Sequence, residues 1–343
     1  MGVTIKDVAR KAGVSISTVS KVIHDAPTIS DATKKRVLEI MKELNYHPNI
    51  IARSFVSQSS YHIGLIMSLK KEDAFLNPYI YEIMGGIEEV ARKNGYLLSI
   101  INTSTLSENP AELEKLIAQK RVDGLIIHLG GFDEKLTAVL NRADFPYVFI
   151  GRPNFATGAS WVDINNAKAG EIATHHLVDQ GCRCIAFIGD GVAIRHSICA
   201  ARAEGYKNAL QAMGYAVDER YIKDMKGTCE NIPALLEELL GMDERPDGLV
   251  CSDNFIAFET LKYLQRKNIE VPGEMLLITF DNYPFAPYTM PPMSTVDIDV
   301  FELGVQSARA IINKLSNPGM TIQYSLLSPS LIIRESSARK ITG

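Results

Sequence analysis

The chain has 343 residues, 46% of them hydrophobic and 22% charged, which is enough apolar content to bury a sizeable core in two or three domains. No apolar run approaches the roughly 18 residues that span a bilayer, and the amino terminus lacks a signal-peptide core, so we expect a cytoplasmic protein. The net charge of −4 is divided unevenly: residues 1–60 hold nine basic and five acidic side chains, a net +4, which leaves −8 for the remainder. A basic head on an acidic body indicates a protein that contacts phosphates at one end only.

The first predicted helix begins after Thr4. Thr4 followed by Asp7 is typical of a capping box, and apolar residues then recur at helical spacing. These residues are Ile5, Val8, Ala9 and Ala12. Gly13 can adopt the left-handed conformation that ends a helix, so we expect the chain to turn there.

A second short helix is predicted directly after this turn, with Ser15 as its cap. Its apolar side holds Val19, Val22 and Ile23. Its opposite side holds short polar and basic side chains, namely those of Ser17, Ser20, Lys21 and His24. Two short helices joined in this way indicate a helix-turn-helix, whose second helix presents such a face to base edges in the major groove.

Ile16 is an apolar residue at the start of this predicted recognition helix. It could contact a thymine methyl group, because the motif reads bases with its amino-terminal residues. The alternative is that it covers the edge of the small core. Thr4 and Thr18 complete the polar residues that we expect near DNA in residues 1–48, the predicted DNA-binding domain.

A third helix is predicted after Ser30, with an apolar stripe that closes a three-helix core, and Pro48 ends it. The next stretch, NIIARSFVS, has helical character but is only about nine residues long, too short to be stable in water without packing. We therefore expect residues 49–61 to be a marginal helix followed by a polar linker.

The exact residue sequence of these segments is more specific than their hydrophobic periodicity. TIKDVARKAGVSISTVSKVI followed by ELNYHPNIIARS closely resembles the amino-terminal domain of the lactose repressor (LacI) family of bacterial transcription regulators. The resemblance is strong over residues 3–55 and continues more loosely through most of the chain. It implies a hinge helix that orders on operator DNA, pairs with its dimer mate and contributes Asn49 and Arg53 to DNA binding.

One position departs from the family pattern. Where the family inserts a leucine into the minor groove, this chain has Phe55. Phenylalanine is also a known apolar wedge between base steps, so the same role is open to it. The alternative is that Phe55 only packs one hinge against the other or against the body.

From His62 onward, apolar runs alternate with helical patterns, which predicts parallel α/β architecture. The first set of runs is HIGLIMS, YLLSIIN, GLIIHLG and YVFIG, with helices at 78–94, 109–120 and 132–143. The second set is CIAFIGD, GLVCSD and MLLITFD, with helices at 166–181, 197–214, 230–241 and 253–267. We expect two similar lobes within 62–343, as in periplasmic sugar-binding proteins and this repressor family, with three chain crossings between them. The expected division is 62–163 with 293–322, and 164–290 with 323–340.

Ligands of open α/β sheets bind beyond the carboxyl ends of the strands, so an effector site is expected where the two lobes face each other. Strand ends and family positions together predict effector contacts from Tyr79, Tyr81, Arg152, Trp161, His196, Arg202, Asp253, Asn254 and Asp281. Aromatic rings can stack on the apolar face of a sugar, and planar polar groups can bind its hydroxyls bidentately. This combination indicates a carbohydrate.

Several of these residues have a structural alternative. Asp281 could cap the following turn, Arg202 could form a salt bridge within the fold, and Trp161 could belong to the core. Arg202 and Asp281 are the strongest transfers from the family, because they lie in RAEG and FDN.

Other functional classes find less support. The pairs Gly130-Gly131 and Gly189-x-Gly191 form neither a dinucleotide-binding nor a Walker sequence, and no nucleophile elbow or HExxH motif is present. The five cysteines show no C-x-x-C spacing, and His175-His176 has no spaced partner for a metal. We therefore predict no cofactor, no metal and no enzymatic activity.

The prediction is a homodimeric repressor that binds double-stranded operator DNA and responds to a carbohydrate. Within the family, TIKDVA, SDATKKRVLEIMKELNYHPN, LNPYIYEIMGGIE and IGRP are most similar to repressors of maltose and maltodextrin operons. The alternative is a solute-binding protein for a sugar transporter. The predicted DNA-binding segment, residues 1–55, argues against it. Induction and corepression remain equally open.

Overall fold

The computed structural model describes residues 3–23, 26–46, 59–69, 78–129, 132–153, 155, 158–192 and 197–339. The chain divides into two compact units, Met1–Tyr61 and His62–Gly343. Most of the predicted hinge, residues 49–58, lies outside the described part. Within that part, no helix is long and apolar enough to cross a membrane.

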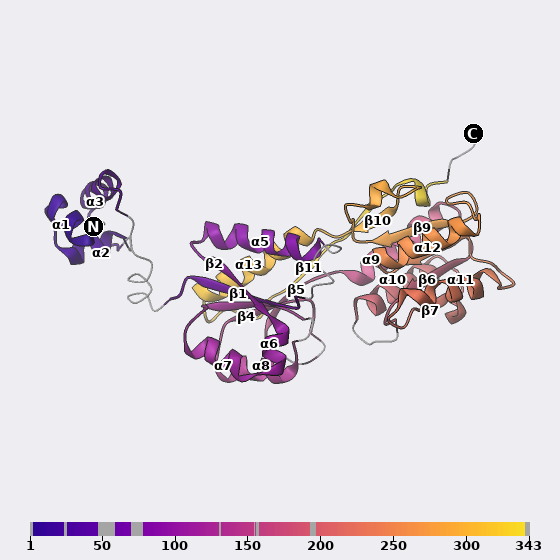
Figure 1. The fold of residues 1–343 in the computed structure, drawn as a ribbon, viewed down its shortest axis with the longest axis horizontal. Helices are drawn as coiled ribbons and strands as arrows, with labels where there is room; N and C mark the ends of the chain where they lie inside the picture. Colours follow the sequence, from indigo (N-terminus) through magenta and orange to yellow (C-terminus); the bar gives the residue numbers. More distant parts are fainter. Residues whose placement is uncertain are drawn as a thin grey trace. The chain divides into compact units, whose positions relative to one another are not determined.

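The described part of the first unit holds three helices, α1 (Ile5–Ala12), α2 (Ile16–Ile23) and α3 (Asp31–Glu43), shown in Figure 1. The backbone N–H of Thr4 donates to Asp7 Oδ2 at 3.0 Å, and Gly13 ends α1 with a φ of 63°. The backbone N–H of Thr18 donates to Ser15 Oγ at 3.1 Å. These bonds confirm the predicted helix-turn-helix. They join residues close together in the sequence, so the sequence alone was enough to predict them.

The three helices bury one small core. Apolar side chains of α1 and α2 meet those of α3, with Val8, Ala9, Ala12, Val19, Val22, Val37 and Met41 buried. This packing uses the back of α2 and leaves its front to solvent.

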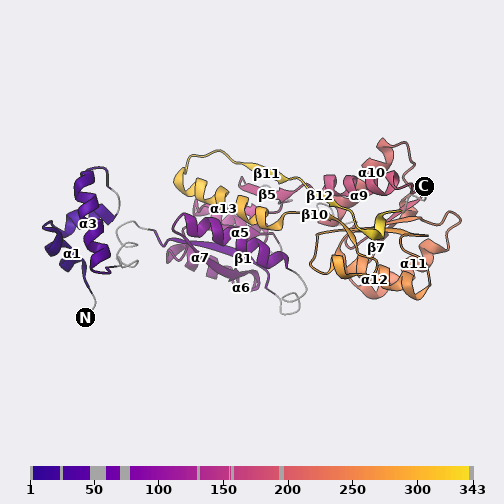
Figure 2. The same ribbon diagram turned by 90° about the horizontal axis from the view of Figure 1, so that it is seen from above.

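The second unit contains two six-stranded sheets, each with helices on both faces (Figure 2). The first sheet has the order β11-β5-β4-β3-β1-β2 and is parallel throughout. Its strands are β1 (His62–Met67), β2 (Leu97–Asn102), β3 (Gly124–His128), β4 (Tyr147–Ile150), β5 (Ser160–Ile164) and β11 (Tyr324–Leu327). One face packs on α5 (Tyr79–Lys93) and α13 (Val300–Ser316). The other packs on α6 (Thr103–Glu108), α7 (Ala111–Ala118) and α8 (Glu134–Arg142).

The second sheet repeats this arrangement in the order β12-β10-β9-β8-β6-β7, with only the β10–β12 pair antiparallel. Its strands are β6 (Ile185–Gly189), β7 (Ile222–Asp224), β8 (Gly248–Cys251), β9 (Leu276–Phe280), β10 (Ser294–Asp297) and β12 (Ser330–Ile332). The helices α9 (Asn166–Asp179) and α10 (Ile198–Ala212) cover one face. The helices α11 (Ile232–Leu240) and α12 (Asn254–Arg266) cover the other.

The chain crosses between the lobes three times, as expected, but the later crossings lie elsewhere than predicted. Strand β10 at 294–297 pairs with β9 of the second lobe, and β11 at 324–327 pairs with β5 of the first. The expected divisions at 293 and 322 were therefore wrong by several residues, and the crossings follow Asp297 and Leu327. Both misplaced strands are only four residues long and carry too little periodicity to assign a sheet.

The carboxyl ends of the two sheets are directed toward the opposite lobe, because β5 leads directly into α9 and β10 leads directly into α13. In both sheets the strand order reverses beside the first strand, between β1 and β3 and between β6 and β8. Such switch points are where doubly wound sheets bind ligands. The topology therefore brings two switch points to the junction of the lobes.

Helices α9 and α10 pack backbone against backbone through Gly170 and Gly205. A Cβ atom built at Gly205 would lie 1.9 Å from the carbonyl oxygen of Ala167, and one at Gly170 would lie 2.0 Å from that of Arg202. Neither oxygen can move without bending its helix. These two glycines therefore set the position from which α10 projects Arg202.

We expect Gly205→Ala to lower the free energy of unfolding by about 2–3 kcal/mol, because overpacking outweighs the roughly 1 kcal/mol that alanine gains in a helix. Urea unfolding measures the change. Gly319→Ala is the matched control, because nothing lies within 4 Å of its Cβ position. A Gly205→Ala protein as stable as the parent would show that the two helices can separate at no cost.

Candidate functional site

The exposed face of α2 carries the residues predicted to read DNA. Ile16 is 45% exposed, and Ser17 and Lys21 are exposed beside it. Thr18 is half-buried, and its hydroxyl lies 2.8 Å from Ser15 Oγ, so it supports the cap of the helix. Ser20 is also half-buried. The solvent-exposed face of α2 that could contact DNA is thus narrower than the sequence predicted. It consists of the first turn of the helix and Lys21.

The remaining predicted DNA contacts divide into two groups. The hydroxyl of Thr4 donates to Asp7 Oδ2 at 2.7 Å, as part of the cap that begins α1. The others lie outside the described residues: His24, Asn49, Arg53 and Phe55.

In the second lobe, Arg202 is the centre of a buried polar cluster. The side chain is 4% exposed, and its guanidinium donates to Asp281 Oδ1 at 2.9 Å and to the carbonyl oxygen of Ser252 at 2.5 Å. Its Nε donates to Asn166 Oδ1 at 3.2 Å, and its Cζ lies 4.4 Å from the centroid of the Phe280 ring. Arg202 is therefore held from α9, β8 and β9 at once, which fixes the orientation of its fork.

Asp281 directly follows β9 and combines a left-handed backbone with a partly exposed carboxylate. Its φ is 59°, and its side chain is 25% exposed. The salt-bridge alternative for Arg202 is thus realised, with Asp281 as the partner. The exposed part of the same carboxylate remains accessible to a ligand.

Asp253 and Asn254 follow β8 and begin α12. Asp253 caps the helix by accepting from the backbone N–H of Ile256 at 3.0 Å, and burial raises the pKa of its carboxyl. Asn254 is only 1% exposed, and its amide faces the end of β9. Both residues therefore have structural roles: Asp253 caps α12, and Asn254 binds the backbone at the end of β9.

The first lobe contributes a second polar group at the ends of β3, β4 and β5. The hydroxyl of Tyr79 lies 3.3 Å from Nε2 of His128, and the two rings meet edge to face. Asp163 accepts from the backbone N–H groups of Arg152 at 2.9 Å and Ile164 at 2.7 Å. Burial raises the pKa of the Asp163 carboxyl and lowers the pKa of His128, which favours the neutral form of each side chain.

The two groups act on one another electrostatically across the lobes. Burial raises the pKa of Tyr79, and the charges of Asp281 and Asp163 raise it further, whereas Arg202 lowers it. The Arg202 charge also acts on Asp163. Side chains from both switch points therefore share one polar environment, which contains rings, carboxylates and a guanidinium.

Three predicted contacts remain, and one of them, Trp161, adjoins this environment, because the Cζ of Arg152 lies 5.8 Å from the centroid of its ring. Trp161 stacks on Tyr324, with ring centroids 4.9 Å apart, and packs on the core behind β5, as its core alternative stated. Tyr81 lies on α5 and is 65% exposed. His196 lies outside the described residues.

Sequence reasoning missed His128, Asp163 and Asn166. His128 could have been found, since it is the polar residue that ends the apolar run GLIIH. Asp163 and Asn166 carry no such signal, because their roles depend on β5 pairing beside β4 and on α9 packing against α10.

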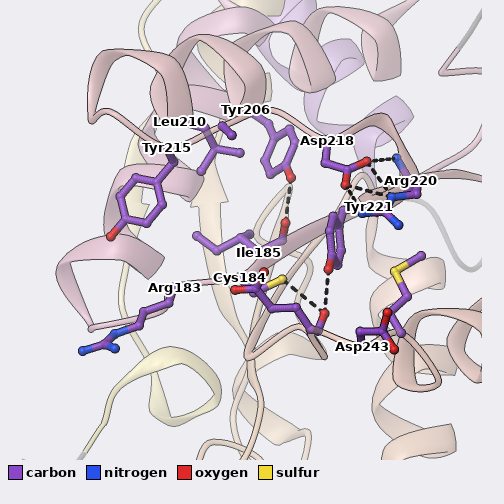
Figure 3. A pocket seen from close by; sticks show the side chains of 13 residues that line it. Arg183, Cys184, Ile185, Tyr206, Leu210, Tyr215, Asp218, Arg220, Tyr221 and Asp243 are labelled. Carbon is purple, nitrogen blue, oxygen red and sulfur yellow. Dashed lines mark hydrogen bonds and ion pairs between the residues drawn. The ribbon is translucent and has the colours of Figure 1, made fainter.

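A separate cavity of about 410 Å³ lies at the opposite, amino-terminal end of β6 (Figure 3). Its lining includes Cys184, Tyr206 and Tyr221, and the Tyr221 hydroxyl donates to the carbonyl oxygen of Glu244 at 2.6 Å. None of the predicted effector residues that the structure describes lines it. The cavity is therefore distinct from the cluster at the lobe junction.

Family models match both units. Residues 4–49 match the bacterial regulatory proteins of the lacI family, and residues 174–337 match a periplasmic binding protein-like domain. The repressor PurR of Photobacterium profundum is 29% identical over 334 residues, which are 97% of this chain and 98% of the relative. The transcriptional regulator CelR in complex with cellobiose superposes with a TM-score of 0.71 at 27% identity, over 97% of this chain and 99% of that one.

The lac repressor dimer bound to operator and the anti-inducer ONPF shares the fold, with a TM-score of 0.74 at 22% identity over 99% of this chain and 100% of that one. The ribose operon repressor of Haemophilus influenzae is 30% identical over 334 residues, which are 97% of this chain and 98% of the relative. The maltose operon repressors suggested by the sequence are not among these similar proteins. From the matching head, the two-lobed body and this full-length similarity, we conclude that the chain belongs to the lacI family of bacterial regulatory proteins.

Proposed function

We propose that this protein is a sequence-specific transcriptional repressor whose DNA affinity is controlled by a small carbohydrate. The observation that carries the proposal is the union of two parts in one chain. The first is a helix-turn-helix with an exposed front at Ile16, Ser17 and Lys21. The second is a two-lobed α/β unit with polar groups converging at its lobe junction.

The effector is proposed to be a sugar because the junction offers complementary chemistry. The Asp281 carboxylate and the Asp163 carboxylate can accept from hydroxyls, and the Tyr79 ring can pack on an apolar sugar face. Maltose and maltodextrins are the first candidates from the sequence. Ribose and cellobiose join them, because one relative is a ribose operon repressor and another similar regulator, CelR, has a structure in complex with cellobiose.

Homodimerisation follows from how this motif reads DNA. A helix-turn-helix covers one half-site, and a two-fold operator requires paired heads. Effector binding at the lobe junction would then change the spacing of the two heads and their fit to the half-sites, which is a coupling between two distinct sites.

The test of operator reading is Lys21→Ala. On duplexes selected from a random pool by the parent protein, the loss should be roughly 1–3 kcal/mol, because a base-edge contact discriminates between sequences. Binding to unselected DNA should change much less. Fluorescence anisotropy with both kinds of duplex measures the difference.

Lys11→Ala is the matched control, because Lys11 lies on α1 and pairs with Glu43 of the same unit at 2.5 Å. Its removal should leave the preference for selected duplexes unchanged. An equal loss on selected and unselected DNA for Lys21→Ala would assign Lys21 to the phosphate backbone. Failure of the parent to enrich any duplex would contradict the proposed function.

A further inference from the structure

Asn254 is a fully buried amide that joins the end of β8 to the end of β9. Its Nδ2 donates to the carbonyl oxygen of Phe280 at 2.8 Å and to that of Asp281 at 2.7 Å. One amide group thus binds two consecutive carbonyl oxygens, and it does so from the first turn of α12. The two bonds hold both the peptide that enters Asp281 and the peptide that leaves it.

The orientation of this amide is fixed by its surroundings. Turning it over would place Oδ1 opposite two carbonyl oxygens, where no hydrogen could lie between them. In the observed orientation Oδ1 is buried and has no hydrogen-bond partner among the described residues. An orphaned buried acceptor costs about 1–3 kcal/mol, so the two donated bonds must be what the position requires.

The backbone that Asn254 holds is unusual. Asp281 has a φ of 59°, a left-handed conformation that aspartate adopts less readily than glycine, although more readily than most other residues. Its N–H donates to the carbonyl oxygen of Val296 at 3.0 Å, and its own carbonyl oxygen also accepts from the N–H of Tyr283 at 2.7 Å. This conformation turns the carboxylate onto Arg202 and leaves its other side partly exposed.

We propose that Asn254 is a positioning residue: it holds Asp281 in the left-handed conformation and so aligns the Arg202–Asp281 pair for the effector, without touching the effector itself. The proposal rests on the proposed function of that pair and changes the role expected for Asn254 from contact to support. At 1% exposure the amide offers no surface to a ligand.

The sharpest test is Asn254→Asp, which keeps the shape of the side chain and removes both donors. Maltose, cellobiose and ribose are titrated calorimetrically into the full chain, and the sugar that binds the parent is carried forward. Asn254→Asp should weaken its binding at least about tenfold. In an Asp281→Ala background the same change should add less than about a twofold loss, because residues that act as a unit are not additive.

Asn231→Asp is the control, since Asn231 Nδ2 donates to the carbonyl oxygen of Met225 at 2.9 Å in the same lobe. It makes the same chemical change away from the site and should leave sugar affinity within about twofold of the parent, whatever it does to the melting temperature. Asn254→Ala repeats the cycle if Asn254→Asp does not fold.

Four results would overturn the inference. Full sugar affinity in folded Asn254→Asp shows that Asp281 needs no such support, and a loss that is independent of Asp281 shows that Asn254 acts by another route. If Asp281→Ala binds sugar like the parent, or if no sugar binds, the proposed effector site fails, and the positioning role fails with it. The first two results leave the proposed function standing, so the two failures are distinguishable.

Discussion

Operator affinity should fall by about three to five orders of magnitude between roughly 50 mM and roughly 200 mM salt, as expected for about 6–10 phosphate contacts made by a dimer. The reason is the distribution of charge. Residues 1–60 carry a net +4 within a chain whose total is −4, so binding energy comes from a basic head while the body is repelled by DNA. Anisotropy titrations across the salt range give the slope directly.

The matched variants remove one positive charge from each unit. Taking away a head lysine that contacts phosphate should reduce the slope by about 1, whereas Lys135→Ala, on α8 of the second unit, should leave it unchanged. Affinity that stays flat between low and physiological salt would refute DNA binding by the head. A slope that responds equally to both variants would show that the body also contacts DNA.

The three described helices of the first unit could be predicted from the sequence because every signal there is local. The Thr4–Asp7 cap, the left-handed Gly13 and the Ser15 cap each act within four residues, and the structure contains all three. The long strands β1, β3 and β9 were equally clear, since a buried parallel strand is a continuous apolar run. Local pattern and final structure agree wherever one segment carries the whole signal.

The candidate site could be predicted only in part, because its geometry depends on contacts between distant segments. Arg202 and Asp281 were each predicted to contact the effector, with a salt bridge as the alternative for Arg202 and a turn cap for Asp281, but their pairing with one another across 79 residues was not predicted. Asn254 was expected to touch ligand, and only its burial shows that it faces the backbone of β9. The short strands β10 and β11 were assigned to the wrong lobes, since pairing rather than periodicity defines them.

Arg202→Ala should lower the free energy of unfolding by about 3–5 kcal/mol and weaken sugar binding by more than tenfold. The guanidinium is almost fully buried and bonds to Asn166, the carbonyl of Ser252 and Asp281, so its removal leaves three polar groups unsatisfied. It also removes the contact with the Phe280 ring. Urea unfolding measures the first effect and calorimetric titration with sugar the second.

Arg202→Lys separates the two effects. Lysine keeps the charge beside Asp281 and should recover part of the stability, but an ammonium cannot reproduce the planar fork that bonds α9, β8 and β9 together. Sugar affinity should therefore stay low in Arg202→Lys. Operator affinity of the folded fraction, measured without sugar, should match the parent in both variants, because the head forms its own core. If folded Arg202→Ala binds sugar as the parent does, the polar cluster at the lobe junction only supports the fold, and the effector site must lie elsewhere.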